Sequence, residues 1–423
     1  VSPPSTRRRG HAEGALRGPP RHFGGAPGAF PGVRGMPCGR IALCSGRAVE
    51  EVSMRQRLAA LLLAASAVPA AAATIPGGYT SLVVFGDSFS DTGNLQAAVE
   101  AATDGRISYP RAPYNDGRFT GGDTWVDVVE DLWGLTDTVD LFNYAFGGAL
   151  AETDPDDGIP DFAEQTLQFA LEDPAVGDDP LGVAFFGGND AIQATYLAGG
   201  SEELGISGIA GDETDPDLVQ AAFDLVEAEA IAAADAILEG ILDVGTDTID
   251  TWLLVNLADV GAAPRFADPN DFGTNPDTGG STAAYASAFT DAYNARLAEV
   301  ADLLRAEGFQ IVEVDLASSF EEILADPSAF GLADATSACG EYFRTILGLA
   351  YYDFRSDVCD EDDVASIDVP FWDDLHPNEI LHVEIASVAD EALTVALIPL
   401  PAPVFLFGGG LLLLGAVARR RRA

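Results

Sequence analysis

The 423-residue chain has no lysine, because all 22 of its basic residues are arginines, and it has only four histidines and four cysteines. Against these stand 67 acidic residues, which give a formal net charge of −45. Nucleic-acid binding needs cations that contact phosphates, so this composition argues against a nucleic-acid-binding protein. The composition fits a protein that is kept soluble by self-repulsion, in surroundings salty enough to screen its charge.

The few basic residues lie mainly at the two ends of the chain. Residues 1–53 have eight arginines, many glycines and prolines, and no apolar periodicity. We interpret them as an over-extended start or a disordered leader, outside the fold. Residues 54–73 begin Met-Arg-Gln-Arg and continue as an almost unbroken run of Leu, Ala and Val. A basic segment, an apolar core and an alanine-rich end predict a secretory signal peptide, and therefore export.

The C-terminal segment, residues 398–423, has a second apolar run. Pro-Leu-Pro-Ala-Pro precedes fifteen uncharged residues, 404–418, and four arginines follow. As a helix the run spans about 22 Å, which is short for a bilayer core of about 30 Å. The segment resembles a PEP-CTERM sorting signal of the Val-Pro-Leu-Pro-Ala type, with Ile398 in place of Val. That resemblance implies transient membrane association and removal of the tail by an exosortase-type protease, and a plain C-terminal anchor is the alternative.

Residues 74–397 form the predicted single domain, which is long enough to bury its own core. Only three acidic residues lie outside it, so the domain has 64 acids against eight arginines. Short apolar runs predict strands at residues 82–85, 139–142, 181–186, 252–255 and 310–314. Helical spacing predicts helices at residues 123–132, 162–171, 218–242, 283–306 and 380–397. Pro377, shortly before the last of these, lies where a first helical position is expected. This alternation predicts a three-layer α/β/α sandwich with a doubly wound, five-stranded parallel sheet.

Two features of this domain leave alternatives open. Cys339 and Cys359 are the only cysteines of the predicted exported part, and they could form one disulfide or remain two thiols. Acidic segments at residues 154–157, 212–217 and 268–277 do not reproduce the twelve-residue calcium loop with its closing glutamate. We favour solvated acidic loops over calcium sites.

Ser88 is the candidate nucleophile. It lies in Gly-Asp-Ser-Phe-Ser-Asp-Thr-Gly-Asn, residues 86–94, directly after the predicted strand at 82–85. An open α/β sheet places its reactive groups at the C-terminal ends of its strands. A serine that attacks an acyl carbon also needs a base, a group that orients the base, and donors for the developing oxyanion.

The base can come from only two histidines of the predicted domain, His376 and His382. His382 falls inside the predicted last helix, where a packed or half-exposed role is expected. His376 lies in the preceding loop, and Asp373 three residues earlier can fold back to its imidazole Nδ1.

Two segments that follow predicted strands offer oxyanion donors. Residues 143–149 end in small residues whose backbone N–H groups can approach a ligand, and residues 187–190, Gly-Gly-Asn-Asp, add the side-chain amide of Asn189. Both segments are expected at the same edge of the sheet as Ser88.

These motifs resemble the GDSL family of lipases and esterases, the SGNH hydrolases, with Phe89 where the family name has Leu. Residues 256–261, Asn-Leu-Ala-Asp-Val-Gly, further resemble the lecithinase and haemolysin branch. The resemblance implies a Ser88–His376–Asp373 triad and an oxyanion hole formed by Ser88 and Gly148 N–H groups with Asn189. Adjacent Gly147 is an alternative to Gly148. Asp87 and Asp91 are expected to brace the nucleophile turn.

The expected function is that of an exported esterase or lipase that hydrolyses small-molecule or lipid acyl esters through an acyl-enzyme, without a metal or organic cofactor. A polysaccharide O-deacetylase of the same fold is one alternative. The other is a catalytically silent surface or matrix protein.

Overall fold

The computed structural model describes residues 75–135, 140–155, 158–200, 208–209, 215–267, 281–346, 349–354, 359 and 368–397, all within the larger of two compact units, residues 68–423. The predicted leader, signal peptide and sorting tail therefore lie outside the described residues. No helix in the described ranges combines the length and the apolar character needed to cross a membrane.

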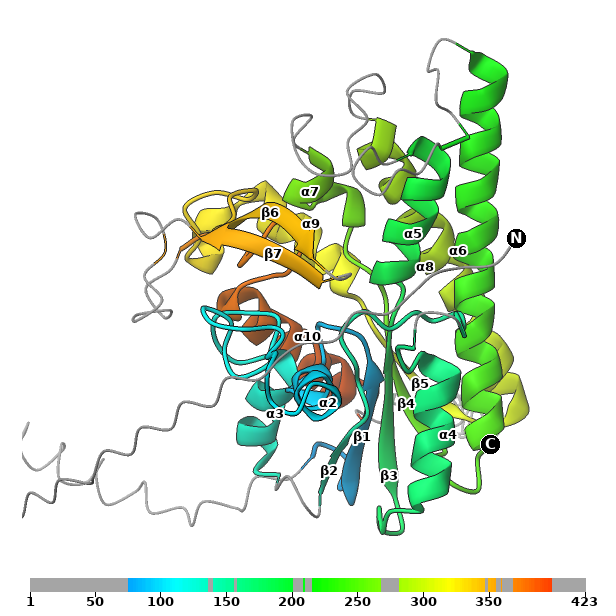
Figure 1. Ribbon diagram of the computed structural model, residues 1–423. Coiled ribbons are helices and arrows are strands. Elements are labelled where there is room, and N and C mark those ends of the chain that lie inside the picture. Colours follow the sequence, from blue (N-terminus) through cyan, green and yellow to red (C-terminus); the bar gives the residue numbers. More distant parts are fainter. Residues whose placement is uncertain are drawn as a thin grey trace, which may run out of the picture. The chain divides into compact units, whose positions relative to one another are not determined.

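A five-stranded parallel sheet forms the centre of this unit, in the order β2-β1-β3-β4-β5 (Figure 1). Its strands are β1 (Ser81–Gly86), β2 (Leu141–Asn143), β3 (Pro180–Phe185), β4 (Thr251–Val255) and β5 (Gln310–Val314). Every residue of β1, β3 and β4 is buried, whereas the edge strands β2 and β5 are partly accessible. Helices on both faces of a parallel sheet favour such unbroken apolar runs in its central strands. All five predicted strands are present.

Helices cover both faces of the sheet. One group, in which α5, α6 and α8 contact one another and α4 contacts α6 and β1, covers one face, and α2, α3 and α10 lie on the other side (Figure 1). Their bounds are α2 (Asn94–Ala102), α3 (Trp125–Trp133), α4 (Phe162–Glu172), α5 (Gly188–Gly199), α6 (Pro216–Val244), α8 (Ser281–Glu307) and α10 (Glu379–Ala396). The predicted three-layer α/β/α architecture is therefore the observed one.

The strand order decides where a site can form. The chain runs from β1 to β2 on one side and then returns to β3 on the other side of β1. Such a reversal opens a crevice at the C-terminal ends of the strands, because the connections leave in opposite directions. Ser88 follows β1 and Asn189 follows β3, so the topology brings these two residues to the same crevice.

The sequence patterns missed several elements. Helices α2, α5, α7 (Pro264–Ala267) and α9 (Leu316–Ala325) were not predicted. Helix α5 begins at Gly188, with Gly187 as its N-cap. It was missed because two glycines in succession are typical of a turn. The last helix starts at Glu379 and not at Pro377, because the Asn378 side chain caps it by accepting from Ile380 N–H at 2.8 Å.

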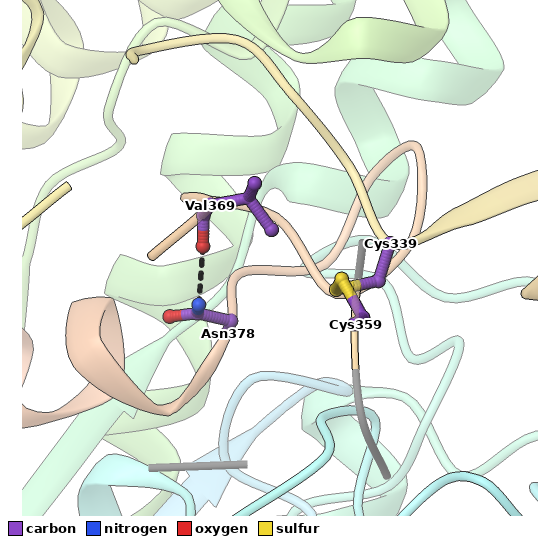
Figure 2. The surroundings of a disulfide bond; sticks show 4 residues. All are labelled: Cys339, Cys359, Val369 and Asn378. Atoms are coloured by element: carbon purple, nitrogen blue, oxygen red, sulfur yellow. Dashed lines mark hydrogen bonds between the residues drawn. A yellow bond between two sulfur atoms is a disulfide. The ribbon is translucent and has the colours of Figure 1, made fainter. Parts of the chain in front are cut away.

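A disulfide-closed segment was also not predicted as structure. It contains the antiparallel hairpin β6 (Gly340–Ile346) and β7 (Leu349–Phe354). Cys339 and Cys359 form a disulfide across it, with their Cα atoms 5.6 Å apart (Figure 2). Of the two alternatives left by the sequence, the structure therefore has the disulfide.

Candidate active site

Ser88 lies in the turn that leaves β1 and is only 6% exposed. The turn is tight at Gly86, where an added Cβ would come within 2.9 Å of Ser90 Oγ and 3.1 Å of the Phe185 carbonyl oxygen. Asp87 Oδ1 accepts from Phe89 N–H at 3.0 Å and closes the turn around the serine. A glycine at 86 and an aspartate at 87 are therefore local requirements for presenting Ser88 at the strand end.

His376 and Asp373 meet Ser88 in a continuous line of hydrogen bonds. His376 Nε2 lies 2.9 Å from Ser88 Oγ, and His376 Nδ1 lies 2.7 Å from Asp373 Oδ2. The other carboxylate oxygen, Oδ1, accepts from the backbone N–H groups of Leu375 and His376 at 2.8 and 2.7 Å. The three-residue spacing thus forms a closed turn, and it brings together the three residues that the sequence selected.

The charge state of Asp373 fits an orienting role. Burial opposes its ionisation, but the charge and hydrogen bond of His376 and a hydrogen bond from Tyr114 keep the pKa of Asp373 below its ordinary value. The Tyr114 hydroxyl donates to Asp373 Oδ2 at 2.6 Å. Tyr114 was not predicted, because it lies 259 residues away in the chain and no local pattern marks it.

The possible oxyanion donors lie in segments that follow β1, β2 and β3, at the same edge of the sheet. Gly147 N–H donates to Asp91 Oδ2 at 2.8 Å, so this amide is already engaged. Gly148, the alternative that the sequence favoured, has φ of 92°, a left-handed conformation suited to glycine. One N–H of the Asn189 side chain donates to the Ala149 carbonyl at 2.9 Å, and this bond positions the amide while its second N–H stays available as a donor.

Asp91 braces both loops of the crevice. Its Oδ1 accepts from Gly93 and Asn94 N–H at 2.7 and 2.6 Å, and its Oδ2 joins the loop of Gly147. The Asn94 side chain donates in turn to the carbonyls of Asn143 and Ala145. The expectation that Asp91 has a bracing role agrees with these contacts.

His382 has a packing role. It is 1% exposed, and its Nδ1 accepts from Trp125 N–H at 3.3 Å, which joins α10 to the start of α3. Burial lowers the pKa of His382 to about 3, so it is neutral at ordinary pH. This agrees with the packed role expected for it and leaves His376 as the candidate base.

A buried ion pair holds the loop that carries Asp373. Arg265 donates to Asp374 Oδ1 at 2.8 Å, with side-chain exposures of only 8% and 2%, and Arg265 N–H donates to the Asp374 carbonyl at 2.8 Å. Sequence reasoning missed Arg265 because its partner lies 109 residues away.

Two buried carboxyls beneath the crevice have unusual protonation. Burial raises the pKa of Asp87 to about 6 and that of Asp190 to about 7. Asp190 accepts from the N–H groups of Ala151 and Glu152 at 3.0 and 3.1 Å, which anchors the loop after Gly148 to the start of α5. The described residues contain no group of three or more side chains suited to hold a metal ion.

The raised pKa of Asp190 predicts a pH-dependent contribution to stability. The folded protein keeps this proton up to about pH 7, whereas the unfolded chain releases it near its ordinary value of 3.8. Folding therefore takes up a proton in this window, and the contribution to stability falls as the pH rises. Between pH 8 and pH 5 we expect the free energy of unfolding of the native protein to rise by about 1–3 kcal/mol relative to that of Asp190→Asn.

Urea unfolding at both pH values, at constant high salt, measures this difference. Lost hydrogen bonds in Asp190→Asn shift its stability at every pH, so only the pH-dependent part bears on the prediction. Equal changes in the two proteins would contradict it.

A serine, a histidine and an aspartate aligned at the C-terminal edge of a parallel sheet form an arrangement that serine hydrolases use. The chain belongs to the GDSL-like lipase/acylhydrolase family, whose sequence model matches residues 82–388. This is a family of ester hydrolases, in agreement with the resemblance drawn from the motifs.

Similar proteins include a phosphatidylcholine-sterol acyltransferase of Aeromonas hydrophila, which is 29% identical over 289 residues, covering 66% of this chain and 70% of that protein. Among solved structures, phospholipase A1 from Streptomyces albidoflavus NA297 is 11% identical, with 74% of this chain and 98% of that chain covered and a TM-score of 0.37. An extracellular lipase from Streptomyces rimosus is 15% identical, with 73% and 99% covered and a TM-score of 0.33. TM-scores this low support no functional conclusion.

Proposed function

We propose that the protein is an exported serine esterase that hydrolyses carboxylic acyl esters through an acyl-enzyme at Ser88. The observation that carries this proposal is the unbroken line from Ser88 Oγ through His376 to Asp373, with contacts of 2.9 and 2.7 Å. No other histidine among the described residues reaches Ser88, since His382 is turned to Trp125.

The geometry supports a two-step reaction. Ser88 Oγ attacks the ester carbonyl carbon while His376 Nε2 takes the serine proton, and Asp373 stabilises the imidazolium that forms. The tetrahedral oxyanion is held by the N–H groups of Ser88 and Gly148 and by the Asn189 side chain. The C–O bond to the alcohol then breaks, and His376 returns the proton to the leaving alkoxide. Water attacks the acyl-enzyme in the same way and releases the carboxylic acid.

A second candidate is transfer of the acyl group to another alcohol in place of water. The similarity to the Aeromonas hydrophila protein, an acyltransferase, supports it. Both reactions share the same acyl-enzyme and differ only in the acceptor, so the proposed roles of Ser88, His376 and Asp373 are unchanged.

The test compares the native protein with Ser88→Ala on nitrophenyl esters from acetate to palmitate, on acetylated glycans, and on phosphatidylcholine vesicles that contain a sterol. Ester hydrolysis that Ser88→Ala lacks would support the esterase. Sterol ester formation would show acyl transfer, and acetate release from glycans would favour the O-deacetylase. Absence of activity on every substrate would refute the proposal and favour a non-catalytic protein.

Export and tail processing are a separate part of the proposal. Their support is the signal-like segment at residues 54–73, the sorting-like segment at 398–423, and the disulfide, which forms in oxidising compartments. Mass spectrometry of exported protein should find a start near Thr74 and no peptide from Arg419–Arg422. An intact tail in secreted material would contradict removal by a processing protease.

A further inference from the structure

An apolar pocket opens beside Ser88 at the C-terminal ends of β3, β4 and β5. Its floor contains Phe185 at the end of β3, Leu257 just after β4 and Leu316 just after β5. These three side chains are 2%, 6% and 4% exposed, so they belong to the core and give the pocket a rigid base.

The far wall of the pocket comes from α9 and α10. Ile323 of α9 and Leu381 of α10 are 1% and 3% exposed, and they pack together with Leu332 in one buried cluster. Half-buried Ile192 on α5 and Phe320 on α9 lie nearer the surface. From their deeper burial we infer that Ile323 and Leu381 close the inner end of the pocket, away from Ser88.

The positions of the oxyanion and the leaving oxygen around the reacting carbon determine whether the acyl chain or the alcohol part of the ester enters this pocket. In the tetrahedral intermediate the oxyanion points to Gly148 and Asn189, and the leaving oxygen must lie near His376 Nε2 to receive its proton. The described residues that line the pocket include Ser88 and Asn189 but neither His376 nor Phe119, whose ring lies 4.9 Å from that of His376. The leaving group therefore belongs on the Phe119 side, and the acyl chain is directed into the pocket.

Charge in the pocket wall restricts that chain further. Glu384 of α10 lines the pocket, and its Oε1 accepts from Ser319 Oγ of α9 at 2.9 Å. Asp87 and Asp259 also line it, and no arginine does so among the described residues. A chain with a terminal carboxylate would meet acids of the same charge in a largely apolar space, which is costly.

We propose that this pocket binds the acyl chain of the substrate, and that Ile323 and Leu381 set an upper limit to its length. The preferred acyl group is then an uncharged, apolar chain whose length Ile323 and Leu381 limit. This inference rests on the proposed esterase function. Each methylene buried in the pocket raises kcat/KM about fourfold until the inner end is reached.

Chain-length profiles of the native protein and three variants test the proposal. Native enzyme should prefer nitrophenyl octanoate to the acetate by at least tenfold and should lose activity towards the palmitate. Ile192→Trp narrows the pocket and should lower the octanoate-to-acetate ratio at least tenfold. Ile323→Ala deepens it and should raise the relative rate on palmitate. Leu197→Trp is the matched control, because Leu197 lies on the same helix as Ile192 but is 42% exposed and should leave the profile unchanged.

The outcomes separate this inference from the proposed function. One outcome would overturn the pocket assignment alone: activity that depends on Ser88 but peaks at acetate, with profiles that the Ile192 and Ile323 variants do not alter. The proposed esterase function would then still stand. Ile192→Trp keeps the test valid if Ile323→Ala folds poorly, since Ile192 is only half-buried.

A second, independent observation concerns Tyr114. Its hydroxyl donates at 2.6 Å to Asp373 Oδ2, the oxygen that also holds His376 Nδ1. The ring is fixed by perpendicular contact with Phe354 at 5.4 Å between ring centroids, and it also contacts Phe119 and Trp372. Phe354 ends β7, within the segment closed by the Cys339–Cys359 disulfide.

The same disulfide-closed segment supports the loop of Asp373 from its other side. Cys339 N–H and Gly340 N–H donate to the carbonyls of Phe371 and Trp372 at 3.0 and 2.8 Å. The Asn378 side chain donates to the Val369 carbonyl and ties the two ends of this loop together (Figure 2).

We infer that Tyr114 is a positioning residue of the active site, which holds Asp373 in register with His376. Without its hydroxyl, Asp373 loses a hydrogen bond that helps to lower the pKa of its carboxyl, so the carboxylate that orients His376 becomes protonated at a higher pH. Tyr114→Phe should therefore lower kcat about 10- to 100-fold with little change in KM. It should also move the acid limb of the kcat/KM profile to higher pH.

Tyr144→Phe is the matched control, because the Tyr144 hydroxyl donates to a carboxylate outside the triad, that of Glu172, at 2.9 Å. It should leave kcat and the acid limb unchanged. A Tyr114→Phe enzyme that is less stable but has the native kcat and pH profile would overturn the inference. Thermal unfolding and the pH profile of kcat/KM, measured on the same preparations, give both readouts.

Discussion

Replacing Ser88 with alanine is expected to lower kcat for ester hydrolysis about 10⁴- to 10⁶-fold while the protein stays folded. Among the described residues, Ser88 has the hydroxyl that contacts His376, with its Oγ 2.9 Å from His376 Nε2, so the proposed acyl-enzyme forms on this oxygen. Alanine removes one oxygen and keeps the backbone N–H proposed for the oxyanion hole. Residual activity should therefore come from binding and the remaining donors.

Ser90→Ala is the matched control for this loss, since both serines lie in the same turn. Ser90 is fully buried, and its Oγ accepts from Trp125 Nε1 at 3.0 Å. Its removal leaves a buried indole N–H without that acceptor and should cost about 1–3 kcal/mol of stability, with kcat within tenfold of native. Single-turnover release of nitrophenol measures both variants. A Ser90→Ala loss as large as that of Ser88→Ala would disprove the assignment of the nucleophile.

Replacing Asp373 with asparagine is expected to lower kcat about 10³- to 10⁴-fold. Asp373 Oδ2 accepts at 2.7 Å from His376 Nδ1, which fixes the tautomer that leaves Nε2 free to take the serine proton. An amide can present an N–H at this position in place of an acceptor, and the ring then loses its orientation. The change is nearly isosteric, so the loss should appear in kcat far more than in KM.

Asp374→Asn separates this effect from damage to the loop. Asp374 is as buried as Asp373, but its partner is Arg265 and not His376. The substitution removes a buried charge-assisted contact with Arg265 and should cost about 3–5 kcal/mol of stability. The folded fraction should keep kcat within tenfold of native, measured at a temperature where unfolding curves show it folded. Equal kcat losses in the two variants would contradict a specific role for Asp373.

Local sequence patterns were sufficient to predict the strands of the sheet and the three triad candidates. The central strands are unbroken apolar runs, because both faces of a parallel sheet are covered by helices. The triad could be found because the domain offers two histidines, and only His376 has an acid three residues before it in a loop. Helix α5 was missed because the glycines at its start are typical of a turn. Helix α9 was missed although its apolar residues recur at helical spacing.

By itself, the sequence determined the α/β class, the order of the motifs and the candidates Ser88, Asp373, His376 and Asn189, because strand burial and a three-residue turn are encoded between near neighbours. Only the tertiary structure showed that the Gly147 N–H is bonded to Asp91 across 56 residues, an observation that favours Gly148 as the proposed oxyanion donor. It alone showed the Tyr114 hydroxyl at Asp373, the Arg265–Asp374 pair and the apolar pocket between α9 and α10. These features join segments far apart in the chain, and their contacts exist only once the helices and strands have packed.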